Sequence, residues 1–325
     1  MVDSRYHPGM KMHLPNSAFL GNIDSFLRGF DPSKPDELQL TSHPRWVSVH
    51  PVVLVMLAAL GDRLNHKNIK SDNFEAKSSH YFARMGLFKY LGIQPTTMTS
   101  HEPAGRFVPI TRIGDQLTLD QFLADLIPLL HLQPVEAEPI RYVVDELVRN
   151  VLEHAQSPHG AFIAAQYYPK SNSVKIGVAD TGIGIKSSIS HSHPVPTDLL
   201  AIRLALTPGI TGTTPAEGGT ARNAGAGLFF TKSIAHANHS FFMLYSGLGF
   251  YKLLKKNSDK LPHDPFRDHH SKIADLPYWQ GTVVGIDISL SQTPQFTSLL
   301  DLMRQSYREA IKERRQLRRR QPRFI

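Results

Sequence analysis

Val174-Lys-Ile-Gly-Val-Ala-Asp180-Thr-Gly-Ile-Gly-Ile185 is the stretch from which the fold is best argued. Its apolar start predicts a strand, and the acid with glycines at the alternate positions 182 and 184 predicts a tight loop after it. Glycine lets a ligand approach the main chain closely, and an acid at a strand end can accept hydrogen bonds from an exocyclic amine. A plain strand and turn is the alternative, because Asp and Gly are among the commonest turn residues.

A polar stripe precedes this strand in the chain. Glu146, Asn150 and His154 are spaced four residues apart, so all three share one face of a predicted helix over 139–155. The apolar side of the helix is supplied by Val143, Leu147, Val151 and Leu152. A carboxylate and a carboxamide on one stripe suit Mg²⁺, which takes oxygen ligands and keeps several waters. A solvated helix face with one incidental Asn is the alternative.

Glycines are frequent in residues 217–228, directly before a predicted helix over 228–237. Free backbone N–H groups and the positive end of the helix dipole make such a position an anion site, whereas a flexible loop without a ligand is the alternative. A Walker A motif is excluded, because Thr231 rather than Gly precedes Lys232-Ser233. No Gly-x-Gly-x-x-Gly follows a predicted strand, so a Rossmann fingerprint is excluded as well.

Gly281-Thr282, which opens a predicted strand over 282–288, completes the set. In order and spacing the four motifs resemble the N box, the G1 box, the G2 box and the late Gly-Thr of the GHKL ATPase superfamily. This superfamily includes gyrase B, the Hsp90 chaperones, histidine kinases, the MutL mismatch-repair proteins and the anti-sigma-factor serine kinases. The resemblance covers residues 138–290 and implies ATP and Mg²⁺ as ligands.

The resemblance also implies a role for each matching residue. Asn150 ligates magnesium, Glu146 polarises the attacking water or hydroxyl, and Asp180 binds the adenine amino group with the help of Thr282 through water. Gly182 and Gly184 shape the base pocket, and Gly225, Gly227 and Leu228 contact the phosphates. Residues 186–224 form a mobile lid. His154 is expected to have a packing role, and Arg222, Asn223 and Lys232 are further candidates for contact with the γ-phosphate.

The order of the predicted elements suggests a two-layer α/β sandwich, with one mixed sheet and helices on one face, which the resemblance identifies as the Bergerat ATP-binding fold. Predicted helices cover 51–64, 80–91, 119–131, 139–155, 198–206, 228–237 and 296–317. Predicted strands cover 38–40, 68–70, 161–168, 174–179, 241–246, 250–253 and 282–288.

Four segments are expected along the chain. Residues 1–35 are expected to be loosely structured, and 36–115 to form a small α/β domain that ends in a polar segment rich in Pro and Gly over 95–116. In 52–63 and 80–91 this domain resembles the STAS-like domains found beside such ATPases, and a helical cap on the ATPase is the alternative. Residues 116–295 are the expected histidine-kinase-like ATPase domain, and 296–325 a basic C-terminal helix and tail.

Composition narrows the class of protein. The chain has 325 residues, 41% of them hydrophobic and 20% charged, and no cysteine, which excludes disulfides and thiolate chemistry and fits a cytoplasmic protein. No apolar run is long enough for a membrane span. The net charge of +8 is concentrated between Arg308 and Arg323, which makes nucleic acid or an acidic partner a candidate ligand of the tail. A solvated helix end is the alternative.

The functional prediction is an ATP-binding protein in a regulatory role, which hydrolyses ATP or transfers its γ-phosphoryl group to a protein Ser or Thr. A protein partner or acceptor, and a homodimer, are compatible with this prediction. The alternative is an ATP-gated conformational switch with little turnover, in which nucleotide binding orders the lid.

Overall fold

The computed structural model describes residues 10–44, 47–71, 79–94, 106–214, 225–255, 261–291 and 296–320. Its centre is a seven-stranded sheet in the order β11-β10-β9-β12-β8-β7-β6. The strands are β6 (Phe107–Ile113), β7 (Ala161–Tyr168), β8 (Ser173–Ala179), β9 (Phe242–Gly247), β10 (Gly249–Leu253), β11 (His270–Ile273) and β12 (Trp279–Ser289).

The sheet differs from the expected mixed sheet, because every neighbouring pair of its strands is antiparallel. The α/β class itself is confirmed. Two strands of this sheet were not predicted. β6 lies in the segment interpreted as a polar boundary, yet Phe107, Val108, Ile110 and Ile113 are buried there. β11 pairs with β10 at the opposite edge.

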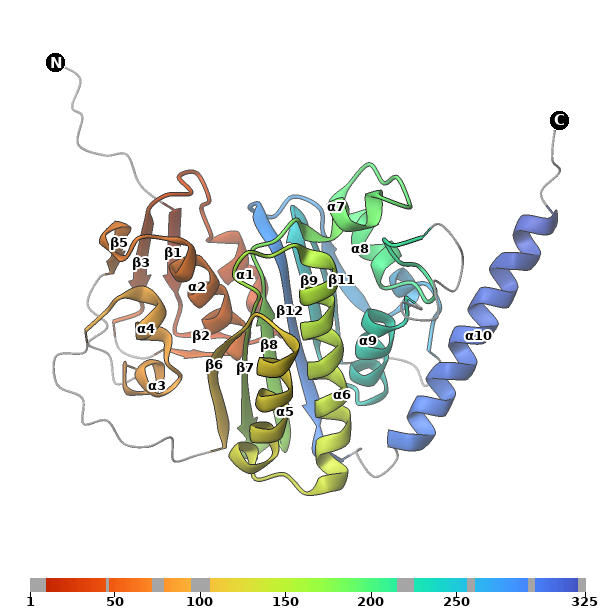
Figure 1. Ribbon diagram of the computed structural model, residues 1–325, viewed down its shortest axis with the longest axis horizontal. Helices are drawn as coiled ribbons and strands as arrows, with labels where there is room; N and C mark the ends of the chain where they lie inside the picture. Colours follow the sequence, from red (N-terminus) through yellow and green to blue (C-terminus); the bar gives the residue numbers. More distant parts are fainter. Residues whose placement is uncertain are drawn as a thin grey trace, which may run out of the picture.

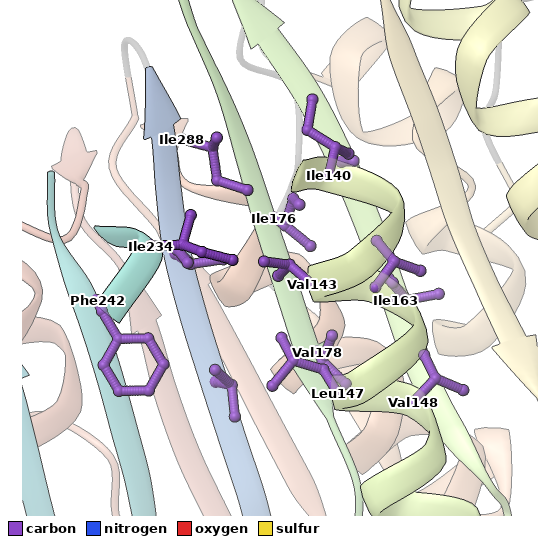
Figure 2. Close-up of a cluster of buried hydrophobic side chains, with 14 of the residues drawn as sticks. Ile140, Val143, Leu147, Val148, Ile163, Ile176, Val178, Ile234, Phe242 and Ile288 are labelled. Atoms are coloured by element: carbon purple, nitrogen blue, oxygen red, sulfur yellow. The ribbon is translucent and has the colours of Figure 1, made fainter. Parts of the chain in front are cut away.

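One face of the sheet is covered by α5 (Gln116–Leu130), α6 (Pro134–Asn150) and α9 (Gly227–Ala237). The Asp115 side chain caps α5 by accepting from the Thr118 N–H at 2.8 Å, and Gln133 with Glu136 forms a capping box on α6. Residues Ile140, Val143, Leu147 and Val148 of α6 belong to one buried cluster with Ile163, Ile176 and Val178 of the sheet (Figure 2). This face of α6 is therefore anchored by hydrophobic burial, which fixes its polar stripe.

The other face of the sheet is covered as well, which the prediction of helices on one face missed. There α2 (Pro51–Arg63) is buried at every position from 51 to 61. Its first turn packs directly on the middle of β8, because a Cβ added to Gly177 would lie 2.8 Å from the Pro51 carbonyl carbon and still closer to Val52. A glycine in the strand is what permits this approach.

The N-terminal unit, residues 10–94, contains α2 and a second small sheet of three parallel strands, β1 (Met10–Leu14), β3 (Leu38–Ser42) and β5 (Ile69–Ser71). Its other elements are β2 (Ser17–Ala18), β4 (Ser48–Val49), α1 (Ile23–Arg28), η1 (His66–Asn68), α3 (Ser79–Arg84) and α4 (Leu87–Leu91). Residues 10–35 are not loosely structured, since β1 and α1 supply buried residues to the core shared with the large sheet. The helix predicted over 80–91 is divided at Gly86, whose φ is 76°.

A buried polar cluster joins the two parts of the chain. His50 caps α2 by accepting from the Val52 N–H through Nδ1 at 3.0 Å, so its Nε2–H donates to Asp287 at 3.2 Å. Lys175 Nζ lies 2.6 Å from the other oxygen of Asp287. Burial lowers the pKa of His50, which keeps the ring neutral, while the bond from His50 and the charge of Lys175 outweigh burial and hold the pKa of Asp287 below its usual value.

The chain ends in α10 (Phe296–Arg320), which lies at the edge of the molecule beyond α9 (Figure 1). Its buried residues are Phe296, Met303, Ser306, Ala310 and Ile311. Most of the predicted basic tail, Arg308–Arg323, lies in α10, and residues 321–325 lie outside the described part of the chain. The role of the tail stays a prediction. Across the described ranges, every helix is too short or too polar to span a bilayer.

We predict that Gly177→Ala destabilises the protein by about 3 kcal/mol, because the new methyl group pushes α2 off the sheet. Urea unfolding monitored by circular dichroism measures the effect. Gly114→Ala is the matched control, since a Cβ at Gly114 meets no heavy atom within 4 Å. Equal stability of the two variants would contradict the close packing of α2 on β8.

Candidate functional site

A cavity of about 260 Å³ opens between the C-terminal end of α6, the loop after β8 and the N-terminus of α9. Eight of the nine residues predicted to bind or act on a nucleotide line it: Glu146, Asn150, Asp180, Gly184, Gly225, Gly227, Leu228 and Thr282. These residues come from parts of the chain up to 136 positions apart, so the tertiary fold brings them together. Arg149, Glu153, Ser188, Ile189 and Thr211 also line the cavity, and the sequence did not single them out.

Asp180 lines the cavity and is 1% exposed. Its Oδ1 accepts from the Gly182 N–H at 2.7 Å, and Thr282 contributes further hydrogen bonds to the carboxylate. Burial raises the pKa of Asp180 to about 7, although these hydrogen bonds act in the opposite direction. A buried carboxylate of this kind suits a ligand that brings its own hydrogen-bond donor.

Gly182 is the one residue of these nine that does not line the cavity. It packs instead against the end of the preceding helix, where an added Cβ would lie 2.8 Å from the Ala155 carbonyl carbon. The Ile183 N–H donates to the Ala155 carbonyl at 2.8 Å. Close packing at Gly182 and the hydrogen bond from Ile183 thus hold the loop after β8 against the end of the helix that carries Asn150.

That helix changes its winding next to the cavity. Residues Val151–Ala155 form a π-helical turn, η2, which ends at Gln156 with a φ of 48°. A π-turn is rare and often marks a functional site, because it rotates the side chains that follow it. Here it directs the Ala155 carbonyl to the loop after β8 and places His154 in the cavity wall.

Glu146 and Asn150 lie one turn apart on the cavity side of α6. The Asn150 Nδ2 donates to the Glu146 carbonyl at 2.7 Å, which leaves the Oδ1 oxygen available as a ligand. Burial and the neighbouring charge of Asp145 raise the pKa of Glu146. Across the cavity, a Cβ added to Gly227 would lie 3.1 Å from Glu146 Cδ, so a glycine lets α9 approach the carboxylate.

The N-terminus of α9 forms the third side of the cavity. Its N-cap residue is Ala226, which supplies no side-chain cap, and the first helical N–H bond runs from Phe230 to the Ala226 carbonyl at 2.8 Å. The backbone N–H groups that precede Phe230 in the helix have no acceptor in the previous turn, so they and the helix dipole favour an anion here. Gly225, with a φ of 66°, leads the chain into this position.

The predicted lid segment is partly ordered into two helices, α7 (Gly184–Ser190) and α8 (Asp198–Ala205). Ile185, Ile189, Ala201 and Ile202 are buried, so this part forms a wall of the cavity. Residues 215–224, with the predicted Arg222 and Asn223, lie outside the described part of the chain.

Lys232 is not near the cavity, so its predicted contact with a γ-phosphate is wrong. It is fully buried on the other side of α9, where its Nζ lies 2.6 Å from Asp268. His236 and Tyr251 bond to the same carboxylate, at 2.8 Å and 3.1 Å. Lys232 lies on the side of α9 that faces the core. Its short distance in sequence from Gly227 did not indicate this orientation.

Among the described residues, no group of three or more His, Asp or Glu side chains forms a metal site. Magnesium needs no such group, because it commonly takes one or two protein ligands together with phosphate oxygens and waters. In comparisons with known proteins, no family model matches the chain and no curated protein is significantly similar to it.

We predict that Asp180→Asn stabilises the nucleotide-free protein at pH 8. The folded state raises the pKa of Asp180 from its usual 3.8 to about 7, so it holds the proton more tightly than the unfolded chain does. The free energy of unfolding therefore falls as the pH rises between these two values, and the full penalty remains above pH 7. Asn removes the charge and with it a penalty on the order of 4 kcal/mol at pH 8.

Urea unfolding at pH 8 and pH 5 measures this effect, and the gain from Asp180→Asn is expected to shrink at the lower pH. The exposed Asp125→Asn change on α5 is the charge-matched control. A variant that is less stable than the wild type at both pH values would show that Asp180 is not a buried, costly carboxylate.

Proposed function

We propose that this chain binds ATP together with Mg²⁺ in the cavity, as a GHKL-type regulatory protein that hydrolyses ATP or transfers its γ-phosphoryl group to a protein. The observation that carries the proposal is the meeting of three groups in one cavity: the buried Asp180, the Glu146–Asn150 pair and the uncapped N-terminus of α9. The position of α5, α6 and α9 on one face of the sheet also supports a Bergerat-type arrangement.

The Asp180 end of the cavity suits the base of the nucleotide. Val178, Ile185, Ile189 and Val284 supply apolar walls around the buried carboxylate. A flat ring fills such a space, and its exocyclic amino group donates to the carboxylate that otherwise remains desolvated. Adenine has both features, whereas guanine presents a carbonyl oxygen at the corresponding position.

The α9 end suits the phosphates. The backbone N–H groups at the helix start and the dipole attract the anion, but the carboxylates of Glu146 and Glu153 in the same cavity repel it. A bound Mg²⁺ would offset this repulsion. The Asn150 Oδ1 would be its protein ligand, because the Nδ2 of that amide is already bonded to the Glu146 carbonyl.

Glu146 is the residue that makes turnover chemically reasonable. Burial raises the pKa of its carboxyl group, which makes the carboxylate a better base for a water or hydroxyl next to the γ-phosphate. Positioning and charge stabilisation supply most of phosphoryl-transfer catalysis, and the cavity offers both. Since only the carboxylate acts as a base, turnover rises with pH as Glu146 loses its proton.

An ATP-gated switch is the second candidate, and it is favoured by the cavity wall that α7, α8 and the following loop form. Ser188, Ile189, Ile210 and Thr211 of this segment line the cavity, so a bound nucleotide contacts it directly. A ligand that contacts a segment in one arrangement only shifts its population toward that arrangement. In this case binding alone changes the surface that a partner meets.

We predict that Asn150→Ala weakens the affinity for ATP in the presence of Mg²⁺ at least about tenfold, because the variant loses the protein ligand of the ion. Isothermal titration calorimetry with and without Mg²⁺ measures this, and without the ion the variant and the wild type are expected to bind alike. Gln305→Ala on the exposed side of α10 is the control for loss of an amide. Unchanged magnesium dependence in Asn150→Ala would remove Asn150 from the metal site.

We predict that Glu146→Gln keeps the affinity for ATP within about twofold and lowers turnover at least about 100-fold, because Gln preserves the shape but is not a base. Transfer of label from γ-labelled ATP to water or to candidate proteins measures turnover and separates an ATPase from a kinase. Glu138→Gln, exposed on the same helix, is the control. Normal turnover in Glu146→Gln would refute the catalytic assignment, and absence of turnover in the wild type would favour the switch.

A further inference from the structure

The first residues of β12 contact the loop after β8 at several points. A bulge between Trp279 and Thr282 interrupts the pairing of β12 with β9. The Trp279 Nε1–H donates to the Asp180 carbonyl at 3.1 Å, and the Gln280 side chain donates to the Gly182 carbonyl. Gly281, with a φ of 102°, allows contact between the two segments, because an added Cβ would lie 2.7 Å from the Asp180 Oδ1.

These contacts fix the main chain of Asp180 on both sides. Its N–H donates to the Thr282 carbonyl at 2.9 Å, while its own carbonyl accepts from the Trp279 indole. Trp279 is 1% exposed, so water cannot replace the indole N–H without disrupting the packing. Loss of this donor leaves a buried carbonyl without its partner, and the loop has to shift to find another.

The Trp279 ring is held from the N-terminal unit. Its centroid lies 6.0 Å from that of Phe30 and 6.3 Å from that of Tyr245. Phe30 is 4% exposed, and the next residue, Asp31, exchanges two backbone hydrogen bonds of 2.9 Å with Lys11 on β1. The position of Phe30, and with it the support of the indole, therefore depends on the sheet of the N-terminal unit.

We infer that Trp279 is a positioning residue for nucleobase recognition, which holds Asp180 in place for an exocyclic amino group and is itself supported by Phe30. Trp279 does not line the cavity, so it acts through Asp180 and not by touching the base. This inference rests on the proposed binding of ATP. It adds that docking of the N-terminal unit sets the preference for an amino-substituted purine.

The test compares ATP with purine riboside triphosphate, which has the same ring and phosphates but lacks the amino group. The full chain is expected to prefer ATP about tenfold, which corresponds to one well-made hydrogen bond to a charged group. In Trp279→Phe, which keeps an aromatic ring and loses the N–H, the preference is expected to fall below about threefold. The affinity for purine riboside triphosphate is expected to stay the same. A variant that failed to fold would instead lose affinity for both nucleotides.

Phe30→Leu tests the link to the N-terminal unit, with Phe26→Leu as its matched control. Phe26 is 3% exposed on α1, so the two changes remove similar buried volume, but only Phe30 has its ring against Trp279. Phe30→Leu is expected to reduce the preference for ATP and Phe26→Leu to retain it. Equal preferences in the two variants would overturn the proposed link.

Fluorescence provides a readout that does not require a variant at the site. The chain has two tryptophans, so in Trp46→Phe the emission comes from Trp279 alone. ATP is expected to shift this emission more than purine riboside triphosphate does, because only ATP bonds to Asp180. The same shift with both nucleotides, or an unchanged preference in Trp279→Phe, would overturn the inference. A wild type that binds neither nucleotide would instead refute the proposed function.

Discussion

Burial of the Asp180 carboxylate is the constraint around which the site is arranged. Among the described residues its partners are neutral, namely the Gly182 N–H and Thr282, and no cation offsets its desolvation. An acid in such a place destabilises the empty protein and is best explained by a ligand that completes its hydrogen bonds. The neighbouring features serve this arrangement: the π-turn that ends at Ala155, the bulge of β12, and the glycines that let these segments meet.

The large sheet links the proposed site on one face to the N-terminal unit on the other. On one face α6 and α9 carry the groups proposed for metal and phosphate, and on the other α2 packs on β8 and β12. The same strand, β8, thus contacts the N-terminal unit at Gly177 and ends at Asp180. His50, Lys175 and Asp287 stabilise this junction through a fully paired buried cluster, which resists separation of the two parts. A domain that packs this closely is suited to influence the site.

Much of the site was accessible from the sequence because each motif is local. The i, i+4 spacing of Glu146 and Asn150, and the Asp-x-Gly after an apolar run, define a helix face and a strand end without reference to the rest of the fold. Eight of the nine residues that the resemblance selected line the cavity. Trp279 and Gln280 escaped notice, because their role depends on a bulge and on contacts with residues about 100 positions away.

Helices and strands with a clear hydrophobic periodicity were predicted well. Elements that depend on tertiary packing were predicted poorly. Apolar residues around the whole of α2 indicated burial but not which elements would pack against it. β6 begins after a segment rich in Pro and Gly and includes Pro109, so its apolar residues were not recognised as an edge strand. Residues 10–35 carry Pro, Gly, Asn and Asp between short apolar groups, and only the tertiary contacts show that β1 and α1 belong to the core.

The most direct test of the central claim is a crystal structure of the full chain grown with Mg²⁺ and a non-hydrolysable ATP analogue. We expect the adenine amino group within hydrogen-bond distance of Asp180, the ion on Asn150 Oδ1, and the phosphates at the backbone N–H groups that begin α9. A nucleotide bound elsewhere, or bound here in the reverse orientation with phosphates against Asp180, would contradict it.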